Sequence, residues 1–324
     1  MRLTRPLLLY FGLVGQWRYS NTIGKLSAAL QIAKRIYTLA QERNDSELMV
    51  GAYRSLAVTL YFIGDFEAAR QSAIRGIQIW RSGSVPSHAE DLDAPVVTCL
   101  TYEALCAWHF GEIAKSKPNM VEAISLSKEL NDMHGLASTL YLTATIAYFE
   151  RNRTEVERFA SEVIELATRQ HFAYWLAVAS ILRGWARSAS GDTAEGILWI
   201  EQGIRDIRAT AAALGLPGFL ARKAEALYLG DRTSEALEAI KEADALAERF
   251  ENRYWCAELH RLRGVFLAAL GAKEGEIETS FDTAIRIAKQ QRSISLEKRA
   301  EATYAEYRRQ KASASGGRAF RLPL

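Results

Sequence analysis

A turn phrase that returns about every forty residues constrains this chain more than any other feature. It is clearest as "GDFEAARQSAIRGIQI" from residue 64, and it comes back as "GDTAEGILWIEQGIRDI" and "GDRTSEALEAIKEADAL". The equivalent turns stand at Gly24, Gly64, Gly111, Arg151-Asn152, Gly191, Gly230 and Gly271, in steps of 40, 47, 40, 40, 39 and 41 residues. Self-similarity at such a period indicates a protein built from stacked supersecondary units.

Helical periodicity lies on both sides of each turn. Apolar residues recur at helical spacing, as at Leu56 and Leu60 before one turn and Ala69, Ala73 and Ile77 after it. A small residue precedes most turns by seven positions, which suits two helices that cross closely. These residues are Ala57, Ala104, Ala144, Gly184 and Gly264. Because strand signals are absent from the pattern, we expect an all-α, right-handed superhelical solenoid of about seven helix pairs over residues 1–310.

Two segments depart from the repeat. The single long step contains "RSGSVPSHAEDLDAP", residues 81–95, which indicates an inserted loop. Residues 293–310 read as a lone final helix, since solenoids commonly end in an atypical element. Residues 311–324 combine serine and glycine with basic side chains, and we expect a flexible basic tail there.

The repeat resembles the tetratricopeptide repeat. The best copy carries the pattern at Tyr53, Leu56, Ala57, Leu60, Gly64, Asp65 and Ala69. Three departures are the period near forty rather than thirty-four, the missing closing proline, and Arg187 at a position where an apolar residue is expected.

A more specific resemblance covers roughly residues 8 to 312. The phrases at residues 174–204 and 257–271, and "GDFEAAR" preceded by "TLYFI", look like the C-terminal repeat arm of bacterial proteins that join an adenylate/guanylate cyclase domain to a P-loop ATPase module. This resemblance implies a sensor or scaffold arm in signal transduction. It does not imply cyclase activity, because the cyclase and ATPase portions have no counterpart in this sequence.

Composition sets the broad class. The chain has 324 residues, 49% of them hydrophobic, and a net charge of +3, which does not suggest a dedicated nucleic-acid binder. Three scattered cysteines are typical of a reducing compartment. The apolar run from Leu7 to Val14 is too short to span a bilayer and lacks a cleavage site, so it favours an ordinary buried helix. We therefore expect a cytoplasmic protein without membrane contact.

Catalytic and metal-binding motifs are missing. No phosphate-binding loop, G-x-G-x-x-G, H-E-x-x-H or G-x-S-x-G pattern occurs. Cys99 and Cys106 are two helical turns apart, which favours core packing over a metal site. The sequence thus predicts no enzyme, no cofactor and no metal.

The sequence also predicts a binding surface on the concave face. In this kind of solenoid the first helix of each pair lines the concave face, and helical spacing then predicts which residues point inward. The candidate binding residues are Arg54, Tyr61, Trp108, His109, Tyr141, Tyr148, Trp185, Glu225, Tyr228 and Arg261. Tyrosine and tryptophan suit recognition because they combine large area with a polar group. A row of aromatic residues at this spacing is equally consistent with side chains that pack between neighbouring repeats. If it is a binding surface, Trp108, Tyr148 and Trp185 should be partly exposed and face a common space.

Two functions fit this reading. The first is a non-catalytic interaction or scaffold module for a protein or peptide partner, including a signalling cyclase or ATPase. The second is a sensor arm that binds a small molecule. An extended open face favours the first, and a closed pocket with convergent polar groups favours the second.

Overall fold

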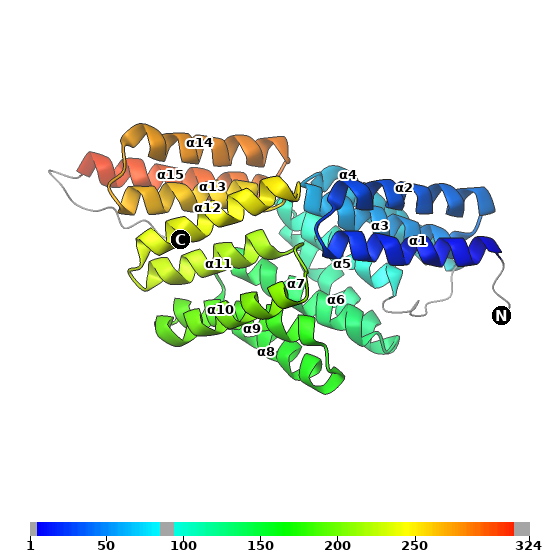
Figure 1. The fold of residues 1–324 in the computed structure, drawn as a ribbon. Coiled ribbons are helices and arrows are strands. Elements are labelled where there is room, and N and C mark those ends of the chain that lie inside the picture. The colour runs from blue at the N-terminus through cyan, green and yellow to red at the C-terminus, as the bar shows by residue number, and fades with distance from the viewer. Residues whose placement is uncertain (1–4, 85–93, 314–324) are drawn as a thin grey trace.

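The computed structural model describes residues 5–84 and 94–313, and these form fifteen α-helices and one short π-helical segment with no strand among them. The seven first helices are α1 (Arg5–Thr22), α3 (Ser46–Ile63), α5 (Pro95–His109), α7 (Met133–Phe149), α9 (Ala173–Ala189), α11 (Leu216–Leu229) and α13 (Cys256–Ala269). Their second helices are α2 (Leu26–Arg43), α4 (Phe66–Ile79), α6 (Ile113–Glu129), α8 (Arg153–Gln170), α10 (Thr193–Ala209), α12 (Thr233–Arg249) and α14 (Glu274–Gln290). The π-helical segment η1 (Trp80–Ser84) follows α4, and the lone helix α15 (Ile294–Ser313) ends the fold. The expected solenoid of seven pairs and a final helix is confirmed (Figure 1).

Local chemistry explains why the turns recur. Gly64 and Gly191 adopt positive φ values of 89° and 105°, which residues with a Cβ rarely accept. The aspartate that follows each of them caps the next helix, because its side chain accepts a hydrogen bond from a backbone N–H in the first turn. Close crossing explains the small residues: a Cβ on Gly184 of α9 would lie 2.6 Å from the carbonyl oxygen of Gly196 on α10.

The solenoid winds past one full turn and touches itself. The backbone N–H of Ala213, just before α11, donates to the Thr22 carbonyl at the end of α1 (2.8 Å). One repeat later, the N–H of Arg253, just before α13, donates to the Phe62 carbonyl at the end of α3 (2.9 Å). Since α11 opens the sixth pair and α1 the first, one superhelical turn takes five pairs.

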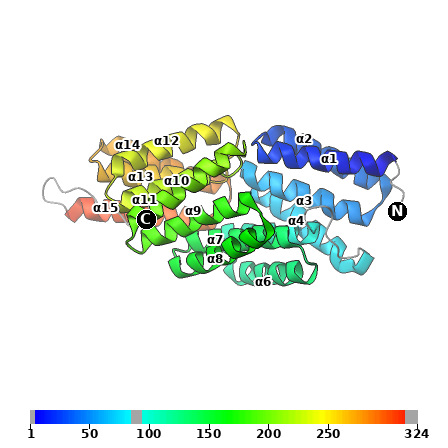
Figure 2. The same cartoon turned by 60° about the horizontal axis from the view of Figure 1, so that its bottom comes forward.

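We call this contact zone between successive superhelical turns the seam. In Figure 1 the blue helices α1 and α2 and the yellow to orange helices α12 to α14 meet near their ends, and Figure 2 shows the same approach from a second direction. α15 continues the pattern, because the Ser295 hydroxyl donates to the Trp108 carbonyl at the end of α5. Packing between turns therefore adds long-range contacts that a more open solenoid lacks.

The apolar run, the inserted loop and the tail predicted from the sequence lie outside the regular repeat pattern. The apolar run near the N-terminus is part of α1, where Tyr10, Leu13, Val14 and Trp17 are buried while Leu8 and Leu9 are exposed. Most of the predicted inserted loop, residues 85–93, lies outside the described residues, as does the predicted tail from residue 314 onward. α15 runs three residues beyond the predicted limit of 310. Within the described residues, no helix has the length and apolar character needed to cross a membrane.

Candidate functional site

The concave stripe predicted from the sequence is almost entirely buried. Tyr141 is half-buried, and the other nine candidate residues are buried: Arg54, Tyr61, Trp108, His109, Tyr148, Trp185, Glu225, Tyr228 and Arg261. Trp108, Tyr148 and Trp185 keep 5%, 0% and 2% of their surface exposed, so their expected partial exposure is wrong. The physical reason is packing inside the superhelix: Trp108 stacks on Phe149, Tyr148 packs on Trp185 and Trp255, and Trp185 donates to the Glu225 carboxylate of the following pair.

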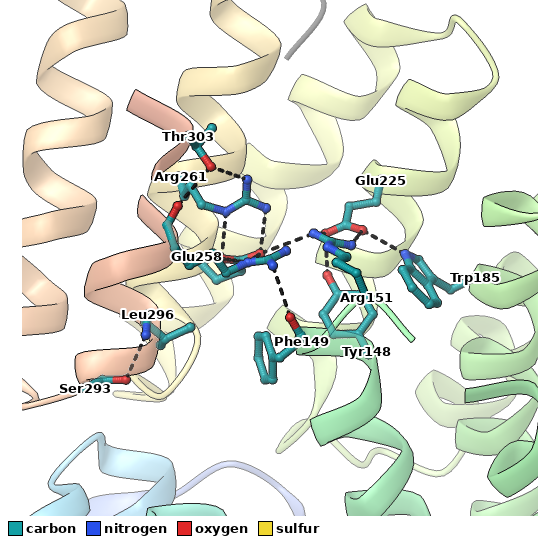
Figure 3. A network of polar contacts seen from close by, with 11 residues as sticks. Tyr148, Phe149, Arg151, Trp185, Glu225, Glu258, Arg261, Ser293, Leu296 and Thr303 are labelled. Atoms are coloured by element: carbon teal, nitrogen blue, oxygen red, sulfur yellow. Dashed lines mark hydrogen bonds and ion pairs between the residues drawn. The ribbon is translucent and has the colours of Figure 1, made fainter. Parts of the chain in front are cut away.

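A buried polar network lies inside the superhelix, where α7 and α9 meet α11, α13 and α15 (Figure 3). At its centre the Glu225 carboxylate of α11 accepts hydrogen bonds from Trp185 Nε1 (2.7 Å), from Arg151 Nη2 (2.9 Å) and from the Tyr148 hydroxyl. These donors come from α9, from the α7–α8 turn and from α7. One carboxylate of α11 therefore joins three elements of the two preceding helix pairs.

A second carboxylate extends the network. Glu258 of α13 forms a two-pronged pair with Arg261 (2.8 and 2.9 Å) and accepts a further bond from Arg299 of α15 (3.1 Å). Arg299 also donates to the Phe149 carbonyl at the end of α7 (3.1 Å), and Arg261 donates to the Thr303 hydroxyl (3.2 Å). α13 and α15 are thus tied to each other and to the earlier turn (Figure 3).

The electrostatics mark this network as structural. Burial alone would raise the pKa of the Glu258 carboxyl, but Arg261, Arg299 and Arg151 together lower it to about 2. Burial likewise opposes ionisation of Glu225, and Arg151 overcomes that effect and lowers the pKa of its carboxyl. Both carboxylates are therefore charged and saturated with donors, so neither is placed to accept a proton from a substrate. Among the described residues, no three His, Cys, Asp or Glu side chains form a metal-binding group.

His109 joins the seam at another point. Its two ring nitrogens hydrogen-bond the Tyr61 hydroxyl (3.2 Å) and the Ser293 hydroxyl (2.8 Å), and its ring stacks on Phe66 with centroids 3.8 Å apart. Burial lowers the pKa of His109 to about 3, because the imidazolium would lose its water. A neutral histidine here fastens α5 to the loop before α15.

Two tyrosines of the first helices keep part of their surface exposed. Tyr141 of α7 and Tyr174 of α9 are half-buried, and both rings pack against Trp175. Tyr254, in the loop before α13, is buried and packs on Phe62. Burial raises the pKa of the Tyr254 hydroxyl well above its ordinary value, and the nearby Tyr141 hydroxyl raises it further. Burial and Tyr141 raise the pKa of Tyr174 in the same way. We call these three residues, which approach one another from three separate elements, the inner tyrosine surface.

Arg222 of α11 lies beside this surface without a carboxylate. Its side chain is fully buried, and it donates to the Thr145 hydroxyl (3.1 Å) and the Gly218 carbonyl (3.3 Å). The guanidinium carbon sits 4.8 Å from the ring centre of Tyr148 and 5.0 Å from that of Trp255. The π faces of the two rings partly replace the missing anion. Within the described residues Arg222 forms no ion pair with a carboxylate, and its Nε has no hydrogen-bond partner.

Sequence reasoning missed several of these residues. Tyr174 stands at the start of a helix and Tyr254 in a loop, so neither fell into the stripe counted back from the turns. Arg151 did carry a signal, because it occupies the turn position that glycine holds in other repeats and adopts a φ of 59° there. Its side chain, which glycine would lack, supplies the ion pair to Glu225.

An open cleft of about 1030 Å³ lies outside the concave face. It runs between the start of α4 and helices α12, α13 and α14, on the seam. Four arginines line it together with four carboxylates: Arg253, Arg263, Arg286, Arg292, Asp65, Glu67, Asp244 and Glu248. Because positive and negative side chains are equally numerous, the charge of the cleft favours neither anionic nor cationic ligands.

Sequence comparison finds one distant relative. No family model matches the chain. An uncharacterised protein of Rhizobium meliloti is 25% identical over 203 residues, which cover 63% of this chain and 20% of that protein. The matched region is therefore one fifth of a much longer relative.

Several solved structures share this architecture. A Rap protein in complex with competence and sporulation factor has a TM-score of 0.63 at 12% identity, covering 97% of this chain and 89% of that chain. NprR in complex with its cognate peptide NprX has a TM-score of 0.59 at 14% identity, with 95% and 84% covered. PlcR of Bacillus thuringiensis, in complex with the peptide PapR7 and DNA, has a TM-score of 0.55 at 18% identity, with 72% and 83% covered. At these identities the likeness establishes the tetratricopeptide-like fold alone.

Proposed function

We propose that this protein is a non-catalytic regulatory module that binds an extended peptide on its inner tyrosine surface. The observation that carries the proposal is that Tyr141 and Tyr174, on first helices, keep part of their surface exposed and both pack against the Trp175 ring. Of the ten residues predicted from the sequence, Tyr141 stays in the site. The other nine are buried and are not part of it.

The chemistry of this surface suits a peptide. Tyrosine rings bury apolar side chains, and their hydroxyls can donate to or accept from a peptide backbone. Arg222 adds a positive charge without a partner carboxylate beside Tyr254. A buried cation that lacks an anion favours a ligand that brings one, so we expect peptides with an acidic side chain or a nearby C-terminal carboxylate.

The structural neighbours support this function. Two solenoids of the same architecture, NprR and PlcR, were solved with peptides bound, and a third, Rap, with competence and sporulation factor. The resemblance to the repeat arm of cyclase–ATPase proteins adds a finer hypothesis, in which the peptide segment belongs to a signalling cyclase or ATPase. That the ligand is a small molecule, and that the protein does not bind nucleic acid, are further hypotheses.

Peptide capture tests the proposal. The immobilised protein is incubated with a pool of random decapeptides, and bound peptides are identified by mass spectrometry. We expect recovery of acidic peptides, strongly reduced by Tyr141→Ala or Tyr174→Ala. Tyr37→Ala is the matched control, because Tyr37 is a half-buried tyrosine on α2, a second helix.

Two outcomes would overturn the proposal. One is that no peptide is enriched over an unrelated helical protein. The other is that Tyr37→Ala reduces capture as much as Tyr141→Ala does, because the inner tyrosine surface would then have no special part in binding.

A further inference from the structure

One helix at the end of the solenoid presents an apolar face to solvent. On α1 the side chains of Leu8, Leu9 and Tyr19 are 53%, 51% and 66% exposed. Between them lie Gly12 and Gly15, where an added Cβ would meet no other atom within 4 Å. None of the exposed residues of α1 whose side chains are described is charged. We call Leu8, Gly12, Gly15 and Tyr19 the α1 outer stripe.

The same stripe exists in the next repeat, where it is fully covered. The residues forty positions later, on α3, are Leu48, Ala52, Ser55 and Thr59, and all four are buried. Their partner is α1 itself. The Tyr10 hydroxyl donates to the Leu48 carbonyl (2.9 Å), and Trp17 Nε1 donates to the Thr59 hydroxyl (2.9 Å). The α1 outer stripe therefore repeats, position by position, a face that packs against a helix.

The two glycines reinforce this inference. A glycine inside a helix costs about 0.5–1 kcal/mol relative to alanine, because it loses more backbone freedom on folding. At Gly184 the missing side chain offsets that cost, because it lets the Gly196 backbone of α10 approach closely. Nothing in the described part of this chain approaches Gly12 or Gly15. A second helix could pack closely across these two glycines.

The last described helix, α15, has a different outer face. The exposed residues of α15 include Lys298, Glu301, Arg308 and Arg309, which is the polar outer face expected of a capping element. An uncharged stripe and a charged helix do not complement each other, so a head-to-tail contact between copies is disfavoured. The α1 outer stripe matches itself better.

We propose that the α1 outer stripe is the interface for a second copy of this chain, with the two α1 helices antiparallel across a two-fold axis. The spacing of the stripe is symmetric, with steps of 4, 3 and 4 residues from Leu8 to Tyr19. A two-fold axis between Gly12 and Gly15 places the glycines of the two copies side by side. Each Leu8 then meets the Tyr19 ring of the other copy, as an isologous contact requires.

Sedimentation equilibrium tests this proposal on the whole chain. We expect the mass to rise from that of the 36.2 kDa monomer to twice that value between low micromolar and several hundred micromolar protein. Gly15→Arg should keep the protein monomeric over this range with an unchanged helical melting curve, because a Cβ there meets no atom of its own chain. Gly275→Arg is the matched control: it changes another helical glycine with open space around it, on α14, and should dimerise as the unaltered protein does.

Three results would overturn the proposal. The unaltered protein could stay monomeric at the highest concentration, or Gly15→Arg could dimerise normally. The third is a monomer that sediments with anionic phospholipid vesicles and loses this property in Gly15→Arg, since the stripe would then contact a lipid surface. None of these results depends on peptide binding, so they leave the function proposed for the inner tyrosine surface to its own test.

Discussion

The seam and the inner tyrosine surface lie on the same concave side, and the first helices contribute aromatic residues to both. Beside the seam, Tyr148 and Trp185 are buried by residues of the following repeats, and their polar atoms are bound to Glu225. On the inner tyrosine surface, Tyr141 and Tyr174 stay half-buried, although they come from α7 and α9, the helices that carry Tyr148 and Trp185. Position along the helix separates the two regions, because the next turn covers only the helix ends.

This difference separates stability from recognition. Truncation in the seam should lower the free energy of unfolding, because it opens a cavity or strands a charge. Truncation on the inner tyrosine surface should mainly lower ligand affinity, as exposed aromatic anchors do. The predictions that follow test this separation, beginning with the largest effect.

Trp185→Ala should have the largest effect on stability. Removing a buried tryptophan costs about 3–5 kcal/mol, and Glu225 also loses a hydrogen-bond donor, so we expect a loss of roughly 5 kcal/mol in the free energy of unfolding. Trp199→Ala is the control, because Trp199 is half-buried on the second helix α10 and should cost about 1 kcal/mol. Urea denaturation measures both. Equal losses would remove the distinction between the seam and the outer helices.

Glu258→Ala should come next. Its removal leaves Arg261 and Arg299 close together without their shared carboxylate, in a buried site where an unpaired charge costs about 3–5 kcal/mol. Glu238→Ala removes an exposed pair with Lys241 and should change the free energy of unfolding by less than about 1 kcal/mol. Should the two variants unfold at the same urea concentration, the network would have no role in joining the turns.

The pH dependence of stability should carry the signature of His109. Its pKa is about 3 in the folded protein, where burial disfavours the imidazolium, and its ordinary value is 6.5. Between these values the unfolded chain binds a proton that the native state does not, so stability falls as the pH drops from about 6.5 towards 3. The loss from this one group approaches 1.4 kcal/mol per pH unit.

The variant His109→Gln isolates this effect. Its free energy of unfolding should depend less steeply on pH between 6 and 4, by about one bound proton. Glu258 contributes at lower pH, since its stabilisation is present above the ordinary carboxyl pKa of 4.5 and is lost as the pH falls towards 2. Parallel pH profiles for His109→Gln and the unaltered protein would show that His109 is not buried in its neutral form.

Tyr141→Phe should produce the smallest change in stability. The ring stays in place and only a hydroxyl of a half-buried residue is lost, so we expect less than about 0.5 kcal/mol in the free energy of unfolding. Affinity for a captured peptide should fall about fivefold, because one hydrogen bond is worth about 1 kcal/mol. Isothermal titration with that peptide measures the change. A stability loss comparable to that of Trp185→Ala would place Tyr141 in the core instead.

The repeat architecture was predictable from the sequence because its determinants are local. A glycine at positive φ, an aspartate that caps the next helix and a small residue at the crossing recur in several repeats, as at Gly64, Asp65 and Ala57. These signals fix the helix pairs and their number. They also placed the candidate residues on the correct helices.

The burial of the stripe was not predictable, because it depends on superhelical pitch. Contacts such as that from Arg253 to the Phe62 carbonyl join residues 191 positions apart, and no local pattern announces them. The same limit hid Tyr254 and Arg222, which belong to the second superhelical turn and reach Tyr141 and Tyr148 of the first. Small changes in the angle between successive repeats decide whether such residues meet.

Closure of the superhelix on itself is the central claim, and amide hydrogen exchange tests it most directly. The Ala213 and Arg253 amides lie in short loops and donate only across the seam, to Thr22 and Phe62. The Asp192 amide, which donates to the Arg187 carbonyl within its own repeat, is the internal reference. We predict that Ala213 and Arg253 are protected as strongly as Asp192 in the native protein. Rapid exchange at both, with Asp192 still protected, would mean that the solenoid is open and that the seam does not exist.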